Sequence, residues 1–245
     1  MPKKTIHRVK QRKRSSSTWD TAVQQDAGTS LTRERIVEAG ITIADRHGLA
    51  AVSVRRIAAQ LQSSPMALYH YVPSKRDLLN LMLDACHAEF QWPGAPITGW
   101  RGVLSHFARE SRRSLKRHPW ASVLRAADPE YGPGGIRTLE SLLTRLFEFG
   151  LDMRTAIRAI GVLFVFVNGF VTAEAAPRKP ANQPRFSKVI LATGRFPNVA
   201  RFVEMGAELP DDEGFERALN WILDGIEADL HTKRNVHAAR RKKSA

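Results

Sequence analysis

The sequence predicts an all-α fold arranged as two helical domains, and three observations support this. Apolar residues recur at intervals of three and four along most of the chain, the spacing that places them on one face of a helix. Gly and Pro residues fall between these stretches, where they end one helix and start the next. No stretch alternates apolar and polar residues as a half-buried strand does.

An N-terminal domain is expected at residues 29–90, and its first helix runs from Thr32 to His47. The apolar residues of this segment share one helix face, and Gly48 supplies a stop signal. Ser53 precedes a second apolar stretch at helical spacing, and a serine at this position caps a helix by accepting a hydrogen bond from its first turn. The second helix therefore begins after Ser53.

A third, short helix and a fourth, longer one follow closely. Ser64 and Pro65 place a capping residue next to a proline at the first helical position, so the third helix begins there and runs to about Tyr71. Ser74 with Asp77 has the spacing of a capping box, which starts the fourth helix. This helix leads to about residue 90.

The C-terminal domain is expected at residues 100–231, because the segment 91–99 is rich in Pro and Gly and forms the best boundary. Every element that we predict in this domain is helical. Residues 132–135, Gly-Pro-Gly-Gly, are expected to form a loop. The expected helices are one that ends before His118, a short one over Trp120–Ala126, and longer ones over Ile136–Phe149, Met153–Glu174 and Phe215–Leu230.

Both ends of the chain are strongly basic and supply most of its net charge of +14. Residues 1–28 are expected to be a disordered basic arm and residues 232–245 a disordered basic tail, since neither has much to bury. Such ends attract DNA, RNA or anionic membranes through counterion release, or they are simply solvated. The charge alone does not choose between these readings.

Cysteine content and hydropathy indicate a soluble cytoplasmic protein. Cys86 is the single cysteine, so no intrachain disulfide forms. The basic N-terminal segment is followed by no apolar stretch, which is not the pattern of a secretory signal. The segment Ala159–Ala173 is interrupted by Asn168 and is shorter than the roughly 18 residues that indicate a membrane span. We therefore expect no membrane partner.

The second and third helices have the arrangement of a helix-turn-helix, in which a short second helix enters the major groove of DNA. Leu68 and Val72 are expected to face inward, which leaves the remaining side chains of the third helix for the groove or its rims. Hydroxyl and imidazole groups bind phosphates, and small apolar groups contact thymine methyls. Lys75 and Arg76, at the start of the next helix, are well placed for phosphate.

At these residues the chain resembles the DNA-binding domain of TetR-family transcriptional regulators. The resemblance runs from Thr32 to Met82 and rests on a Ser-x-Arg-x-Ile-Ala second helix and on Leu-Tyr-x-Tyr-Val-x-x-Lys-x-x-Leu, which begins at Leu68. It implies that one set of residues contacts double-stranded DNA, with some at base edges and others at the backbone. The expected DNA-binding residues are Ser53, Arg55, Ser64, Pro65, Met66, Ala67, Tyr69, His70, Tyr71 and Lys75.

The rest of the chain is similar, more weakly, to the C-terminal domain of the tetracycline-repressor branch of this family. The similarity rests on His118-Pro119-Trp120, on Asn168-Gly169-Phe170 and on the closing helix. It implies a homodimer formed by the long central helix and the last helix, and a small-molecule effector bound between that interface and the DNA-binding domain. The central helix lacks a set of histidines suited to a magnesium-chelated drug, so neither a metal nor a cofactor is expected.

Candidate effector-binding residues are aromatic or polar groups on the predicted C-terminal helices: His118, Trp120, Phe164, Asn168 and Phe170. The aromatic members are equally consistent with an ordinary helical core. Asn168 is a polar group in an apolar helix, and a buried amide needs a partner, either across the dimer interface or on a ligand. The sequence leaves both alternatives open.

These observations predict a DNA-binding regulator, in its commonest form a repressor that a small-molecule effector releases from a palindromic operator. The alternative is an effector-independent architectural or nucleoid-type DNA-binding protein. An enzyme is not expected, because the sequence has no Gly-rich phosphate loop, no Gly-x-Ser-x-Gly and no metal-ligand spacing.

Overall fold

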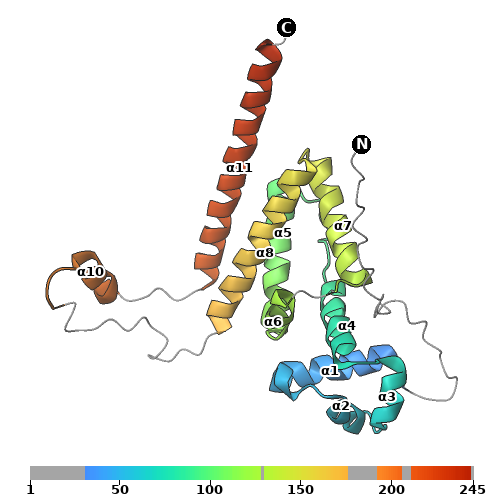
Figure 1. The fold of residues 1–245 in the computed structure, drawn as a ribbon. Coiled ribbons are helices and arrows are strands. Elements are labelled where there is room, and N and C mark those ends of the chain that lie inside the picture. Colours follow the sequence, from blue (N-terminus) through green and yellow to red (C-terminus); the bar gives the residue numbers. More distant parts are fainter. Residues whose placement is uncertain (1–30, 128–129, 176–191, 206–210, 244–245) are drawn as a thin grey trace, which may run out of the picture.

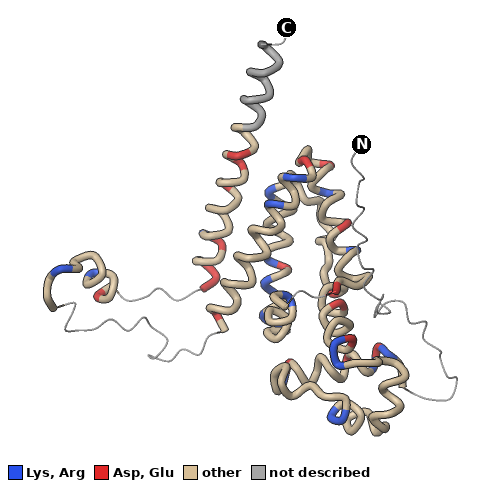
Figure 2. Tube along the Cα trace, viewed as in Figure 1, with Lys and Arg blue, Asp and Glu red and all other residues tan. Residues whose placement is uncertain are grey.

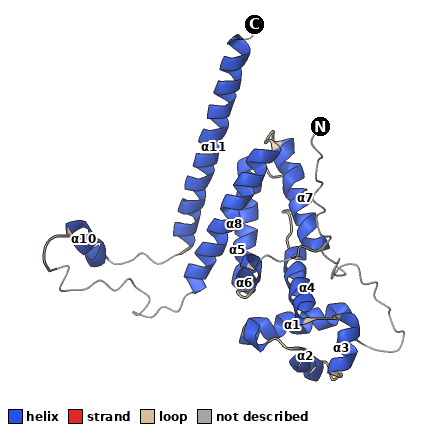
Figure 3. Ribbon diagram, viewed as in Figure 1, coloured by secondary structure: helices blue, strands red, loops and turns tan. Residues whose placement is uncertain are grey.

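The computed structural model describes residues 31–127, 130–175, 192–205 and 211–243. Every regular element in these ranges is a helix, and none is a strand (Figure 3). The all-α prediction is therefore confirmed. The expected basic arm at residues 1–28 lies outside the described residues.

Three helices form the N-terminal end of the molecule (Figure 1). They are α1 (Arg33–His47), α2 (Val54–Gln60) and α3 (Pro65–Tyr71), with a 3-10 turn at Leu49–Ala51. Their predicted starts are confirmed by capping hydrogen bonds: the side chains of Thr32, Ser53 and Ser64 accept from the backbone N–H three residues on. Ile36, Ile57 and Leu68 are fully buried and hold these helices together.

Helix α4 (Lys75–Ala88) joins this end to the C-terminal bundle. Ser74 caps it, as predicted, by accepting from Asp77 N, and the Ser74 hydroxyl donates to Asp77 Oδ2. Met82 is fully buried against α1, where its sulfur lies close to Gly40. The other end of α4 packs against α7 (Pro133–Glu148).

The start of α7 corrects the prediction of a loop at residues 132–135. The helix begins at Pro133, and its first-turn amides at Gly134 and Gly135 donate to the Asp84 carboxylate over 3.0 and 2.8 Å. Asp84 belongs to α4, so it caps α7 from fifty residues away in the sequence. A Cβ atom on Gly134 would lie 2.6 Å from the Asp84 carbonyl oxygen, which explains why glycine is needed here.

The C-terminal bundle is built around α5 (Gly99–Arg117) and α8 (Met153–Ala175), with the short α6 (Ala121–Ala126) and α7 packed beside them. Its core includes Leu104, Leu115, Leu142, Leu146 and Leu163, all fully buried. Helix α10 (Pro197–Met205) contributes no buried residue and is drawn apart from the bundle (Figure 1).

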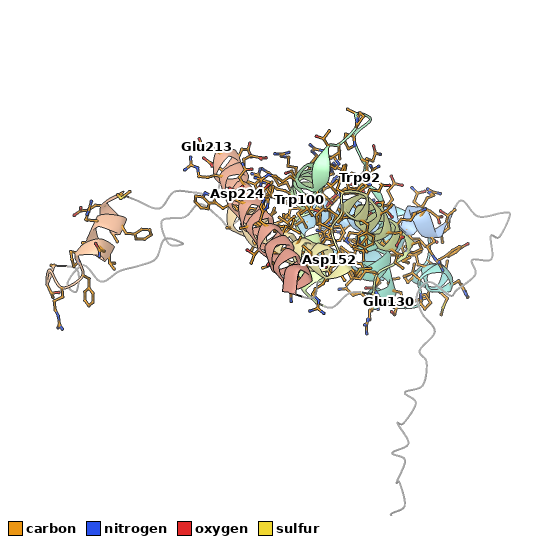
Figure 4. The ribbon with its side chains drawn as sticks, turned by 90° about the horizontal axis from the view of Figure 1, so that it is seen from above. Trp92, Trp100, Glu130, Asp152, Glu213 and Asp224 are labelled. Atoms are coloured by element: carbon orange, nitrogen blue, oxygen red, sulfur yellow. The ribbon has the colours of Figure 1, made fainter. Side chains whose placement is uncertain are left out.

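Helix α11 (Asp212–Lys243) lies along α8 and α5 (Figure 4, where Glu213 and Asp224 mark it). Phe215 anchors it in the core, and Arg101 and Arg109 of α5 pair with its acidic residues Asp224 and Glu216, each at 2.7 Å. The helix continues to Lys243, whereas we expected it to end at Leu230, ahead of a disordered tail. The reason is local, because residues 226–243 contain neither Gly nor Pro to stop a helix.

Only one face of α8 is buried in the described chain, although the helix is apolar nearly all round. Ala159, Leu163 and Val167 are buried, whereas Val162 and Val165 are 51% and 70% exposed. By length and composition α8 is the one described helix that could cross a membrane, contrary to our expectation for residues 159–173. Its packing against α5, α7 and α11 is that of a helix in a folded bundle.

Candidate nucleic-acid interface and ligand cavity

The outer surface of α3 presents most of its side chains that were predicted to contact DNA. Met66 and Tyr69 are 71% and 47% exposed, and Pro65 and His70 are exposed too. Leu68 and Val72, predicted to face inward, are 1% and 2% exposed. Two buried apolar side chains therefore hold the helix against the domain core, and Pro65, Met66, Tyr69 and His70 remain accessible.

Two of the expected contacts are also helix caps. The hydroxyl oxygens of Ser53 and Ser64 accept from the N–H groups of Arg56 and Ala67 over 3.2 and 3.1 Å. Each hydroxyl keeps its own proton, which is free to be donated to a phosphate oxygen. Capping thus fixes both groups at the N-terminal ends of α2 and α3.

Exposed cations flank α3 on the neighbouring helices, and Figure 2 shows Lys and Arg at this end of the molecule. Arg55 and Arg56 are exposed on α2, and Lys75 and Arg76 on the first turn of α4. The first turn of a helix carries N–H groups without intrahelical partners, which adds to the attraction of these cations for phosphate.

Two of the expected DNA contacts are less accessible than the rest. Ala67 and Tyr71 are half-buried, and the carbonyl oxygen of Tyr71 accepts from Arg33 Nε over 3.3 Å. This bond ties the end of α3 to the start of α1. All ten predicted residues lie on α2, α3, the start of α4 or the caps of these helices.

The C-terminal bundle encloses a cavity of about 550 Å³ between α4, α5, α7 and α8, with α6 at one side. This volume lies within the range of sites for small organic molecules. Most of the lining is apolar, and it includes the aromatic rings of Phe90, Phe107 and Phe164. Exposed lining residues, among them Tyr131, Ile136 and Ile157, connect the cavity to the surface.

Three polar atoms of the cavity lining are buried without a hydrogen-bond partner: His87 Nδ1, Ser114 Oγ and Arg125 Nε. Burial, followed by the nearby charge of Arg125, lowers the pKa of His87 to about 3, so this imidazole is neutral at ordinary pH. The His87 ring stacks on Tyr131 with centroids 5.6 Å apart. Burial likewise lowers the pKa of Arg125 and raises that of the Cys86 thiol to about 12.

Of the five residues proposed from sequence for the effector, only Phe164 lines this cavity. Asn168 lies one turn further along α8, where its Nδ2 donates to the Phe164 carbonyl oxygen over 2.8 Å. Phe170 packs with Phe166 and Phe215, and the Arg112 guanidinium lies over the Phe215 ring at 4.4 Å. These aromatic residues belong to the core, which is the alternative that the sequence left open.

His118 and Trp120 lie beside the cavity and contact the N-terminal helices instead. His118 Nδ1 is 2.9 Å and Trp120 Nε1 2.6 Å from Asp45 Oδ1 of α1. On its other side, His118 Nε2 lies 3.3 Å from Glu89 Oε1, and Glu89 does line the cavity. His118 therefore connects the cavity wall to α1, and Trp120 adds a second contact to Asp45.

Sequence reasoning missed the polar lining residues His87, Ser114 and Arg125. Each sits on a helix with an apolar side, and spacing alone does not tell which of its neighbours the side chain meets. Among the described residues, no group of three or more His, Cys, Asp and Glu side chains is arranged to hold a metal ion.

Comparison with known proteins gives matches over both parts of the chain. Residues 36–82 match the model of bacterial regulatory proteins of the tetR family, and residues 92–230 match the tetracyclin repressor-like C-terminal domain. The transcriptional repressor DrrR1 of Streptomyces coeruleorubidus is 35% identical, with 90% of this chain and 87% of that protein covered. The class A tetracycline repressor of Escherichia coli is 25% identical, with 87% and 98% covered.

Solved structures have the same fold. ActR of Streptomyces coelicolor in complex with actinorhodin is 25% identical and superposes with a TM-score of 0.68, over 82% of this chain and 99% of ActR. Together with the arrangement of α2 and α3, these matches show that the chain belongs to the TetR family and is a DNA-binding transcriptional regulator rather than an enzyme.

Proposed function

We propose that this protein is a homodimeric repressor that leaves its operator when a small molecule fills the cavity of the C-terminal bundle. One observation carries this proposal: α4 reaches both sites. Its N-terminal cap Ser74 follows α3 directly, and its last turns place Cys86 and His87 in the cavity wall. A ligand that shifts the end of α4 therefore also acts on the support of the DNA-reading helix.

The DNA contacts follow from the exposed surface of α3 and its neighbours. Met66 and Tyr69 face the major groove, while Lys75 and the hydroxyls of Ser53 and Ser64 bind phosphates. A dimer whose two α3 helices are about 34 to 36 Å apart meets successive major grooves on one side of the duplex. The operator is accordingly a near-palindrome with half-sites one helical turn, or a multiple of it, apart.

The dimer is supported by the apolar surface of α8 and α11. Val162, Val165 and Trp221 are half to mostly exposed on the described chain. Soluble proteins rarely leave an apolar surface of this kind in contact with water, and a second copy of the same two helices would cover it. The same pairing accounts for an apolar α8 without a membrane, in a protein that acts on DNA in the cytoplasm.

The cavity favours effector control over the architectural alternative. An apolar cavity of about 550 Å³ that connects to the surface has the size and lining of a site for a small organic molecule, for which a purely structural DNA-binding protein has no use. The related ActR has been solved with actinorhodin bound, and DrrR1 is a repressor. If effector and operator favour different arrangements of α4, each must weaken the binding of the other by the same factor.

The proposal is tested by genome-wide immunoprecipitation of DNA bound to the protein, followed by a salt-titrated shift assay on the strongest site. We expect one or a few near-palindromic sites, lower affinity for Tyr69→Ala and Lys75→Ala, and no change in the dimer for either variant. Diffuse binding without a motif would contradict the proposal and support the architectural alternative.

Cavity occupancy is tested by Leu142→Trp, which fills the space and should prevent release from DNA by any ligand that releases the wild type.

A further inference from the structure

The cavity contains a positive charge that no described acidic residue neutralises. Arg125 of α6 lines the cavity, and its Nε is buried without a hydrogen-bond partner. The ionisable groups whose charges affect the pKa of Arg125 are Tyr131 and Cys86. The Cys86 thiol stays neutral, because burial raises its pKa to about 12.

The two carboxylates of the cavity lining are already engaged elsewhere. Glu89 pairs with Arg117 and contacts His118, and Glu110 pairs with Arg113. Neither forms an ion pair with Arg125. The guanidinium is partly shielded from water and has no counterion among the described residues, so the charge at Arg125 is a point where an anionic ligand group would gain most.

The neighbours of Arg125 suit an oxygen-bearing aromatic molecule. His87 is neutral, so its imidazole offers one donor and one acceptor rather than a second positive charge. Ser114 Oγ is a further unpartnered polar atom in the wall. The remaining surface is dominated by aliphatic side chains and by the rings of Phe90, Phe107 and Phe164, which favour a flat apolar body.

We propose that the effector is an aromatic acid, a fused-ring molecule with an ionised oxygen group that pairs with Arg125 while its rings lie among the phenylalanines of the cavity. This proposal rests on the function proposed above and specifies the chemistry of its ligand. Arg125 is then the residue that selects acidic molecules over neutral ones of the same shape. An uncharged apolar ligand would leave the guanidinium buried without a partner and would bind more weakly.

The test compares two fluorescent compounds of nearly equal shape, anthracene-2-carboxylate and anthracene-2-carboxamide, binding to the full chain. We expect the wild type to prefer the carboxylate by about 30-fold, the lower end of the effect of one buried charge pair. Arg125→Met, which keeps the length of the side chain, should abolish this preference and leave amide binding within about threefold. Arg137→Met, on the exposed surface of α7, removes the same charge and should preserve the preference.

Arg117→Met tests whether the second arginine of the cavity contributes to the preference. We expect no contribution, because Arg117 is already paired with Glu89. The preference should survive this change. Equal affinity for the two compounds in the wild type, binding of neither, or a preference that persists in Arg125→Met would each overturn the proposal. Operator binding is measured separately by the shift assay, so a wrong ligand class with intact operator recognition remains distinguishable from a failure of the proposed function.

Discussion

The indole nitrogen of Trp120 donates a hydrogen bond of 2.6 Å to Asp45 Oδ1, and this contact joins the C-terminal bundle to α1. His118 Nδ1 lies 2.9 Å from the same oxygen. Glu89, which contacts the other side of His118, is part of the cavity wall. A continuous series of polar contacts therefore runs from the cavity to the helices that carry the DNA-binding surface.

Asp45→Asn tests the strength of this connection. The change keeps the shape of the side chain but removes the charge that two ring nitrogens contact, and hydrogen bonds to a charged group contribute about 1.5–3 kcal/mol. We expect the free energy of unfolding to fall by about 2 kcal/mol in urea titrations at a fixed protein concentration. Glu38→Gln, an exposed substitution on the same helix, is the control and should change it by less than about 0.5 kcal/mol. Equal effects of both variants would contradict the structural role of Asp45.

Lys75→Met tests the phosphate contact at the start of α4. Loss of one phosphate-bound cation should weaken binding to all DNA sequences alike and reduce the slope of log affinity against log salt by about 1. The measurement is a shift assay on the operator and on an unrelated duplex at several salt concentrations. Arg137→Met, exposed on α7, controls for the change in net charge. If Lys75→Met left the salt slope at the wild-type value, Lys75 would not contact phosphate.

Local signals in the sequence were enough for the helix starts of the DNA-binding end. Ser53, Ser64 and Ser74 each cap the helix that follows, because a cap depends on residues only two or three positions apart. The inward direction of Leu68 and Val72 also followed from helical spacing. The DNA-binding surface could be proposed from sequence for this reason.

The features that sequence reasoning missed depend on contacts between distant segments. The start of α7 at Pro133 is fixed by Asp84 of α4, and no pattern within the Gly-Pro-Gly-Gly segment indicates that Asp84 is its partner. The cavity also depends on packing between segments that are distant in the sequence. Phe164 faces it whereas Phe170, six residues later, faces Phe215, and only the packing of α8 against its neighbours decides between these two environments.

Val165→Lys tests the dimer surface. Val165 is 70% exposed on α8, so in the free chain a lysine there costs little, whereas a charge buried at an apolar interface is strongly unfavourable. We expect sedimentation velocity to show a shift from dimer to monomer, together with loss of operator binding. Val123→Lys on α6, at a site that is 60% exposed, is the matched control and should remain dimeric. A dimeric Val165→Lys would place the interface elsewhere.

Glu174→Gln tests the ion pair that fastens the end of α8 to α5. Glu174 accepts from Arg112 Nε over 3.0 Å, and the two side chains are only 11% and 10% exposed. Hydrogen bonds from Arg112 lower the pKa of Glu174 below its usual 4.5. The ionised carboxylate therefore contributes its full stabilisation above about pH 4.5, and this contribution is lost as the pH falls through the lowered pKa of Glu174. We expect the variant to be less stable by about 2 kcal/mol at pH 7 and the difference from wild type to shrink in acid, as measured by urea unfolding at each pH. Glu213→Gln removes an exposed i,i+4 pair with Arg217 and should have little effect at any pH. A difference between Glu174→Gln and wild type that stays constant from pH 7 into acid would show that the ionised carboxylate is not the source of the stability.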